Sequence, residues 1–156
     1  MRLYLLRHAE AELYRADDFS RRLTEKGKDQ AKRVGEFLEA RKIIPDLILS
    51  SPVLRAKETA EIVVNKLGGS DLSMVPWLAC GMSPETALQK LSSYAHFDSV
   101  MIVGHEPDFS ALIVTLIGLE SSAAINVSKA SLTAIDLARL TPGFGVLRFF
   151  LPVKLL

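Results

Sequence analysis

The stretch "LYLLRHAEAE", residues 3–12, decides how this chain is interpreted. Its apolar residues 3–6 predict a short buried strand, which ends at Arg7 and His8 and not at a turn residue such as Gly or Asn. A charged residue and a histidine are awkward to place at the exit of a core strand. They mark either a functional site or an accident of the surface, and the rest of the sequence has to distinguish the two.

The composition suits one domain over residues 1–156 with a single, well-filled core, because 49% of the residues are apolar. The formal net charge of +1 is not that of a general nucleic-acid binder or of a protein that binds anionic membranes. Any affinity for anions must therefore be local. The longest apolar run, "ALIVTLIGL" at residues 111–119, is too short to span a bilayer.

Cys80 is the only cysteine, so no disulfide can form within the chain. This fits a reducing compartment, and we expect a cytoplasmic protein. The simplest interpretation of Cys80 itself is a small, buried hydrophobic residue.

Apolar runs and helix punctuation predict strands that alternate with helices. The predicted strands are residues 3–6, 46–50, 73–75, 99–104, 131–138 and 146–152. The predicted helices are 25–41, capped by Thr24; 51–68, capped by Ser51 with Pro52 at its first position; one capped by Ser83; and 107–118. The last two strands are expected to be antiparallel, around the turn "TPGFG". This order predicts an α/β fold with a mainly parallel sheet.

Histidine, serine and arginine side chains follow three of these strands. The first strand is followed by Arg7 and His8, the second by Ser51 and then Arg55 one helical turn later, and the strand 99–104 by His105. If these strands are parallel neighbours, four of these side chains converge at one edge of the sheet: Arg7, His8, Arg55 and His105. Ligands of such sheets bind beyond the carboxyl ends of the strands.

Arginines beside histidines repel one another unless an anion lies among them, and the arginine fork matches the oxygens of a phosphoryl group. A histidine that faces phosphorus can act as a nucleophile, and the remaining groups can stabilise charge on the oxygens. Each residue alone has a simpler explanation. Arg55, for example, could be a solvated helix residue paired with Glu58 or Glu61, and His96 is set aside as a loop residue. The coincidence at three strand ends favours a site.

Four segments resemble, in order and spacing, the histidine phosphatase superfamily: "LYLLRHAEAE", "LTEKGKDQA", "SSPVLRAKETA" and "VGHEPDFS". Together with "CGMSPE" they are most similar to its small SixA-type branch of phosphohistidine phosphatases. The resemblance covers nearly the whole chain and implies a phosphoglycerate-mutase-like, three-layer sandwich with helices on both faces of the sheet. It also implies that His8 is the phosphorylated nucleophile, that Arg7, Arg55 and His105 form the phosphate pocket, and that no metal or cofactor is needed.

Two further assignments come from the resemblance. Arg21 matches a phosphate-side arginine of this branch, although Arg22 beside it makes a solvated loop charge the simpler explanation. Ser51 matches a small hydroxyl residue at the mouth of the pocket, although its capping position explains it equally well.

The sequence departs from the superfamily at two places. Ala9 stands where most members have Gly, which requires that Ala9 avoid a positive φ. Members that act on alkyl phosphates carry a mid-chain carboxylate that protonates the leaving oxygen, whereas residues 76–82 contain none. The nearest carboxylate, Glu85, is explained by its place in the first turn of a capped helix.

The expected function is a metal-independent phosphatase that acts on phosphohistidine in a protein, for example a histidine-phosphotransfer domain, and that phosphate-like anions inhibit. Three alternatives stay open: a phosphatase or mutase for small phosphate esters, a non-catalytic phosphate-binding module, and a metal site that uses His8 and His105. The metal site has no supporting carboxylate–His or Cys–His spacing.

Overall fold

The computed structural model describes residues 1–14, 17–68 and 70–156. Within these ranges six strands form one sheet in the order β3-β2-β4-β1-β5-β6. The strands are β1 (Arg2–Arg7), β2 (Leu47–Ser50), β3 (Asp71–Met74), β4 (Ser99–Gly104), β5 (Leu132–Leu137) and β6 (Gly145–Leu151). The helices are α1 (Glu25–Ala40), α2 (Leu54–Leu67), α3 (Pro84–Leu91) and α4 (Asp108–Ile117). Short 3₁₀ turns are η1 (Asp18–Ser20), η2 (Pro76–Leu78), η3 (Ser92–Tyr94), η4 (Ser122–Ala124) and η5 (Val153–Leu155).

The sheet is mainly parallel, as the alternation of strands and helices predicts. β1 pairs in parallel with β4, and β2 pairs in parallel with both β3 and β4. The closing pair, β5 and β6, is antiparallel, and β5 also runs antiparallel to β1. The carboxyl ends of β1, β2 and β4 therefore meet at the same edge of the sheet.

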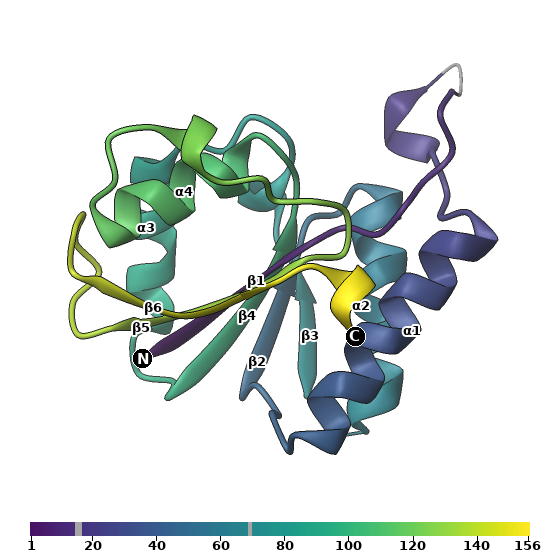
Figure 1. Cartoon of the computed structure of the whole chain (residues 1–156), viewed down its shortest axis with the longest axis horizontal. Helices are drawn as coiled ribbons and strands as arrows, with labels where there is room; N and C mark the ends of the chain where they lie inside the picture. The colour runs from purple at the N-terminus through teal and green to yellow at the C-terminus, as the bar shows by residue number, and fades with distance from the viewer. Residues whose placement is uncertain (15–16, 69) are drawn as a thin grey trace.

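Two layers of helices cover the sheet, with α1 and α2 on one face and α3 and α4 on the other (Figure 1). Alternate residues of β1 serve the two faces, because successive side chains of a strand point in opposite directions. Tyr4 and Leu6 belong to the core under α1 and α2, and Leu3 and Leu5 to the core under α3 and α4. The predicted three-layer sandwich is confirmed. None of the helices in the described ranges is long and apolar enough to cross a membrane.

The helix ends largely follow the predicted punctuation. The Thr24 side chain accepts a hydrogen bond from the Gly27 amide at the start of α1, and Ser83 accepts one from the Thr86 amide at the start of α3. Gly68 ends α2 in the left-handed conformation, with φ of 68°, which glycine adopts without a Cβ penalty.

The predicted cap of the second helix is wrong. The helix starts at Leu54 with Val53 at the capping position, so Ser51 and Pro52 lie outside it. The reason is that Ser51, the residue directly after β2, is still bonded to the neighbouring strand: its amide donates to the Val103 carbonyl of β4 at 2.9 Å. Its hydroxyl oxygen accepts from the Val53 amide at 3.2 Å and shapes the turn that leads into the helix.

Candidate active site

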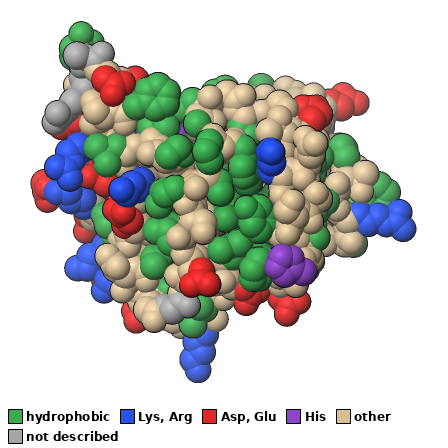
Figure 2. All heavy atoms as spheres, turned by 180° about the vertical axis from the view of Figure 1, so that it is seen from behind, with side chains coloured by type: hydrophobic (Ala, Val, Ile, Leu, Met, Phe, Trp, Pro, Cys, Tyr) green, Lys and Arg blue, Asp and Glu red, His purple; other side chains and the backbone are tan. Residues whose placement is uncertain are grey.

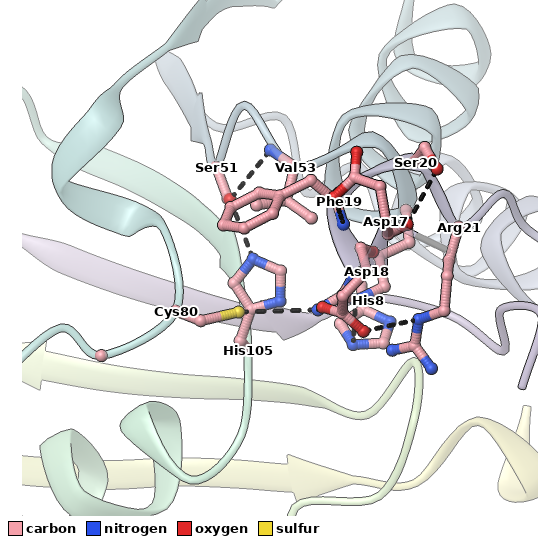
Figure 3. A network of polar contacts seen from close by, with 12 residues as sticks. His8, Asp17, Asp18, Phe19, Ser20, Arg21, Ser51, Val53, Cys80 and His105 are labelled. Atoms are coloured by element: carbon pink, nitrogen blue, oxygen red, sulfur yellow. Dashed lines mark hydrogen bonds and ion pairs between the residues drawn. The ribbon is translucent and has the colours of Figure 1, made fainter. Parts of the chain in front are cut away.

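The structure brings the residues after three strands together. His8 follows β1 and donates its amide to the Gly104 carbonyl at the end of β4, at 2.9 Å. His105 follows β4, and its ring centroid lies 5.3 Å from that of His8. Ser51 follows β2 and contacts His105 (Figure 3). The predicted convergence at the carboxyl edge of the sheet is therefore observed.

His8 is oriented by its neighbour in sequence. Its Nδ1 atom lies 2.7 Å from the Ala9 carbonyl oxygen, which can only accept a hydrogen bond. The ring proton is therefore on Nδ1, and Nε2 carries the lone pair. His8 is 5% exposed, and this burial lowers its pKa to about 3. At neutral pH the ring is uncharged and Nε2 can act as a nucleophile.

His105 is buried beside His8, and its Nε2 atom lies 2.8 Å from the Ser51 hydroxyl oxygen. That oxygen already accepts from the Val53 amide, so its own hydrogen is available for His105. When the Ser51 hydroxyl donates to Nε2, the ring proton of His105 lies on Nδ1, an atom that is buried and without a partner in the described part of the chain. Burial, followed by the positive charge of Arg55, lowers the pKa of His105 to about 4.

Arg55 is buried, with 4% of its surface exposed, so it is not a solvated helix residue. The carboxylates that could have paired with it along the helix have other partners. Glu58 binds Arg22 at 2.9 Å, and Glu61 lies 3.8 Å from Lys57. The Nε atom of Arg55 instead donates to His8, at 3.3 Å from Nε2.

Arg7 also reaches the site, where positive charge outweighs negative charge. Its Nη1 atom donates to the Val127 carbonyl at 2.7 Å, while its Nε atom is buried without a partner in the described residues. Burial lowers the pKa of Arg7, the charge of Glu106 raises it, and the charge of Arg55 lowers it further. Unpaired donors beside a neutral nucleophile define a pocket that lacks an acceptor, which an oxyanion would supply.

Asp18 is the residue of the site that sequence reasoning missed. It lies on η1, and its Oδ2 atom is 3.1 Å from Nη2 of Arg55. Its Oδ1 atom is 2.9 Å from Nε of Arg21, so Arg21 is linked to the pocket through Asp18 (Figure 3). The sequence signal for Asp18 is its spacing from Arg21, because an acidic and a basic residue three positions apart can form an ion pair within one turn.

Cys80 is wrongly predicted as a buried hydrophobic residue. It is exposed, and its sulfur accepts from Nη2 of Arg55 at 3.5 Å. Desolvation of the thiol nevertheless raises its pKa, so the sulfur is a poor nucleophile. Asp108 holds this segment in place, because its Oδ2 atom accepts from the amides of Gly81 and Met82 at 2.8 and 3.0 Å.

Ala9 fits the backbone without strain. Among the described residues, Lys42 and Ala130 are the non-glycine residues with positive φ, so Ala9 avoids that region as required. Its amide donates to the Thr59 hydroxyl at 3.1 Å, and that hydroxyl donates to the Arg55 carbonyl at 2.7 Å. Thr59 thereby joins the strand exit to α2.

Glu85 lies outside the pocket. It is exposed in the first turn of α3, and hydrogen bonds to its own amide and to Ser83 lower its pKa. His96 is also exposed and stacks on Phe97, with ring centroids 4.2 Å apart. Within the described ranges no group of three or more His, Cys, Asp or Glu side chains could hold a metal ion.

Comparisons with known proteins agree with this geometry. The sequence model of the histidine phosphatase superfamily (branch 1) matches residues 3–79. An uncharacterised protein from Picosynechococcus is 30% identical over 86% of this chain and 84% of its own. The phosphohistidine phosphatase SixA of Escherichia coli is 28% identical over 87% of this chain and 86% of its own. The chain belongs to the histidine phosphatase superfamily.

Solved structures extend the similarity over the whole chain. A crystal structure assigned to SixA from Agrobacterium tumefaciens is 29% identical, covers 97% of both chains and has a TM-score of 0.85. Two structures with lower identity show the same fold. They are a SixA complexed with tungstate, at 24% identity and a TM-score of 0.89 over 99% of this chain and 98% of its own, and the alpha-ribazole phosphatase of Shigella flexneri, at 24% and 0.81 over 98% and 97%.

Proposed function

We propose that the protein is a phosphohistidine phosphatase that hydrolyses phosphohistidine in a partner protein through a covalent phospho-His8 intermediate. One observation carries the proposal. The lone pair of His8 Nε2 lies beside the Nε donor of Arg55, and two further groups, Nε of Arg7 and, in the tautomer protonated there, Nδ1 of His105, are buried and have no acceptor in the described residues. A tetrahedral oxyanion bound to Nε2 would supply those acceptors.

In the first step, Nε2 of His8 attacks the phosphorus atom and the bond between phosphorus and the substrate nitrogen breaks. Arg7, Arg55 and His105 stabilise the charge on the phosphoryl oxygens. Nδ1 of His8 keeps its proton throughout and donates it in a hydrogen bond to the Ala9 carbonyl oxygen, which stabilises the positive charge of the phosphorylated ring. In the second step, water attacks phosphorus, His8 is regenerated and inorganic phosphate leaves.

The leaving group favours phosphohistidine over alkyl phosphates. A phosphorylated imidazole that is protonated on its other nitrogen leaves as a neutral ring, whereas an alkoxide needs a proton donor. The segment 76–82 provides no carboxylate, and Glu85 is exposed and bonded to its own helix. The Asp18 carboxylate binds two arginines, and that of Glu106 binds the amide and hydroxyl of Ser110.

Exposed apolar side chains beside the site support a protein substrate. Leu13, Tyr14 and Phe19 are 90%, 86% and 59% exposed, and they flank the turn that carries Asp18. The turn η1, which carries Phe19, projects from the body of the molecule near the carboxyl edge of the sheet (Figure 1). Large apolar side chains that are exposed together are typical of surfaces that bind proteins. A histidine-phosphotransfer domain is a partner of this kind.

The second candidate is a phosphatase for small phosphate esters, which the fold shared with alpha-ribazole phosphatase favours. A side-by-side assay with a phosphohistidine protein, free phosphohistidine and a panel of sugar phosphates distinguishes the two. We expect the phosphohistidine protein to have the highest kcat/KM, vanadate and tungstate to inhibit competitively, and EDTA to have no effect. Sugar phosphate turnover at an equal rate would favour the second candidate, and activity lost to EDTA and restored by a divalent ion would refute the metal-independent reaction.

A further inference from the structure

We propose that Asp18 is an internal competitor of the phosphoryl group: its carboxylate holds Arg55 and Arg21 before a phosphoryl group binds, and it helps to expel inorganic phosphate after hydrolysis. The inference rests on the proposed function in one respect, namely that the pocket binds a phosphoryl group. It adds a residue and a step that the chemistry of His8 does not require.

Asp18 offers the two arginines several acceptors at once. Its carboxylate oxygens lie 3.1 Å from Nη2 of Arg55 and 2.9 Å from Nε of Arg21, and its main-chain carbonyl accepts from Nη1 of Arg55 at 2.9 Å. Both Nη atoms of Arg55 therefore contact the same residue, Nη1 through a hydrogen bond and Nη2 through an ion pair, and the contact of Arg21 is also an ion pair. Two oxygens of a phosphoryl group would take the same positions in a bidentate contact. Asp18 and a phosphoryl group thus cannot both bind Arg55 in full.

The two members of this ion pair differ in how easily they can move. The side chain of Arg55 is 5% exposed, whereas that of Asp18 is 61% exposed. Arg55 is held in the pocket by His8 and by α2, but η1 has no buried residue among Asp18, Phe19 and Ser20. An incoming oxyanion can therefore displace the Asp18 carboxylate into water at small cost, while Arg55 stays in place.

The competition lowers the affinity for substrate and product by the same factor. A phosphorylated protein can recover the loss through contacts outside the pocket, but inorganic phosphate cannot. Return of the Asp18 carboxylate to Arg55 then releases phosphate. Asp18 is therefore expected to act on ligand affinity and product inhibition, through Arg55, and not on the transfer of the phosphoryl group.

The test is isothermal titration calorimetry of the full chain with tungstate and with inorganic phosphate, for the wild type and for Asp18→Asn. Loss of one carboxylate charge from the ion pair should tighten both anions about tenfold. Inhibition of turnover by phosphate should become stronger by the same factor. The rate constant of phosphoryl transfer, measured in a single turnover, should stay unchanged. Asp18→Ser, which also removes the charge, should act in the same direction.

Asp17→Asn is the matched control. Asp17 belongs to the same turn, and its side chain accepts from the Phe19 amide at 3.0 Å, a cap that asparagine can also provide. The control removes one negative charge from the same segment without touching Arg55, so it should leave both affinities within about twofold.

The outcomes separate this inference from the proposed function. If the wild type binds tungstate and His8 becomes phosphorylated, but Asp18→Asn binds both anions equally or more weakly, Asp18 does not compete and the inference is wrong. A slower single-turnover transfer in Asp18→Asn at unchanged affinity would place Asp18 in the chemical step and would contradict the inference as well. If the wild type neither binds the anions nor labels His8, the proposed function fails and this inference fails with it.

Discussion

The Nε atom of Arg55 lies 3.3 Å from Nε2 of His8, and it donates a hydrogen bond to the lone pair of that nitrogen. On the other edge of the guanidinium group, Nη2 contacts the Asp18 carboxylate and the sulfur of Cys80. One side chain therefore links the proposed nucleophile to the anion-binding surface of the pocket. When Nε2 bonds to phosphorus its lone pair is no longer available, and the planar, rigid guanidinium group then presents this N–H to a phosphoryl oxygen beside Nε2.

Arg55→Lys should therefore cost much of the activity although it keeps the charge. A lysine ammonium group cannot reach His8 and two phosphoryl oxygens with fixed geometry. We expect kcat/KM for a phosphohistidine substrate to fall by about 100-fold or more, the size seen when one donor to the transition state is lost.

Arg22→Lys is the control for this substitution. Arg22 is exposed and pairs with Glu58 at 2.9 Å, outside the pocket, so its replacement should leave kcat/KM within about twofold. Wild-type kinetics in Arg55→Lys would show that the fork is not used.

The stability of the protein should depend on pH through His8 and His105. Burial lowers the pKa of His8 to about 3 and that of His105 to about 4, whereas an unfolded histidine has a pKa of about 6.5. Between pH 6.5 and about 4 the unfolded chain binds protons that the folded chain does not, so stability falls as pH falls. Each histidine contributes up to about 1.4 kcal/mol per pH unit in this window.

Urea unfolding at a series of pH values between 4 and about 7 measures this effect. The slope of the unfolding free energy against pH should decrease in His8→Asn and again in the double variant with His105→Asn, because each substitution removes one titrating group. An unchanged slope in both variants would show that these histidines do not titrate with depressed pKa values in the folded protein.

Leu13→Ser combined with Tyr14→Ser should lower the activity on a phosphohistidine protein. Both side chains are largely exposed and lie outside the phosphate pocket. Loss of two apolar contacts should lower kcat/KM for a phosphohistidine protein about tenfold while turnover of an aryl phosphate stays unchanged.

Ile44→Ser provides the comparison for this pair. Ile44 is also exposed, at 55%, but it precedes β2 and so lies at the opposite end of the sheet. It should affect neither substrate. Equal losses on the protein and on the aryl phosphate in the Leu13 and Tyr14 variant would contradict a docking role, because they would point to damage of the pocket itself. Hydrophobic side chains are also exposed elsewhere, for example across the centre of the face shown in Figure 2. Ile44→Ser therefore tests whether the loss of any exposed apolar side chain lowers kcat/KM.

Glu85→Gln should change catalysis very little. Glu85 is exposed, and bonds within its own helix start lower its pKa, so it stays ionised and cannot serve as a proton donor near neutral pH. We expect unchanged kcat/KM on phosphohistidine and a small loss of thermal stability. A collapse of activity on alkyl phosphates that the wild type hydrolyses well would identify Glu85 as the acid and would favour a small-molecule phosphatase.

The fold and the convergence of the site could be predicted because both follow from local patterns. Short apolar runs alternating with capped helices give a parallel sheet, and residues directly after parallel strands meet at one edge. Arg7, His8 and His105 each lie within one residue of the end of a strand, so their positions required no knowledge of loop structure.

The positions of Asp18, Ser51 and Cys80 depend on tertiary contacts, and only the i,i+3 spacing of Asp18 and Arg21 leaves a trace in the local sequence. Asp18 lies on a turn that is placed by its contacts with Arg55 and Arg21. Ser51 carries a good capping side chain, but its amide is bonded to the Val103 carbonyl of β4, and the helix starts three residues later at Leu54. Cys80 lies on a loop positioned by the Asp108 carboxylate, which comes from α4. The partners that decide these positions, Arg55 for Asp18, Val103 for Ser51 and Asp108 for the loop of Cys80, are far away in the sequence.

Trapping of a phosphorylated His8 tests the central claim most directly. The protein is mixed with a ³²P-labelled phosphohistidine substrate, quenched within milliseconds to seconds at alkaline pH, where phosphohistidine survives, and digested for mass spectrometry. We predict label on His8, lost on a chase with unlabelled substrate, together with no label and no turnover in a folded His8→Ala variant. Turnover by His8→Ala, or turnover of the wild type without label on His8 at any quench time, would contradict the covalent mechanism.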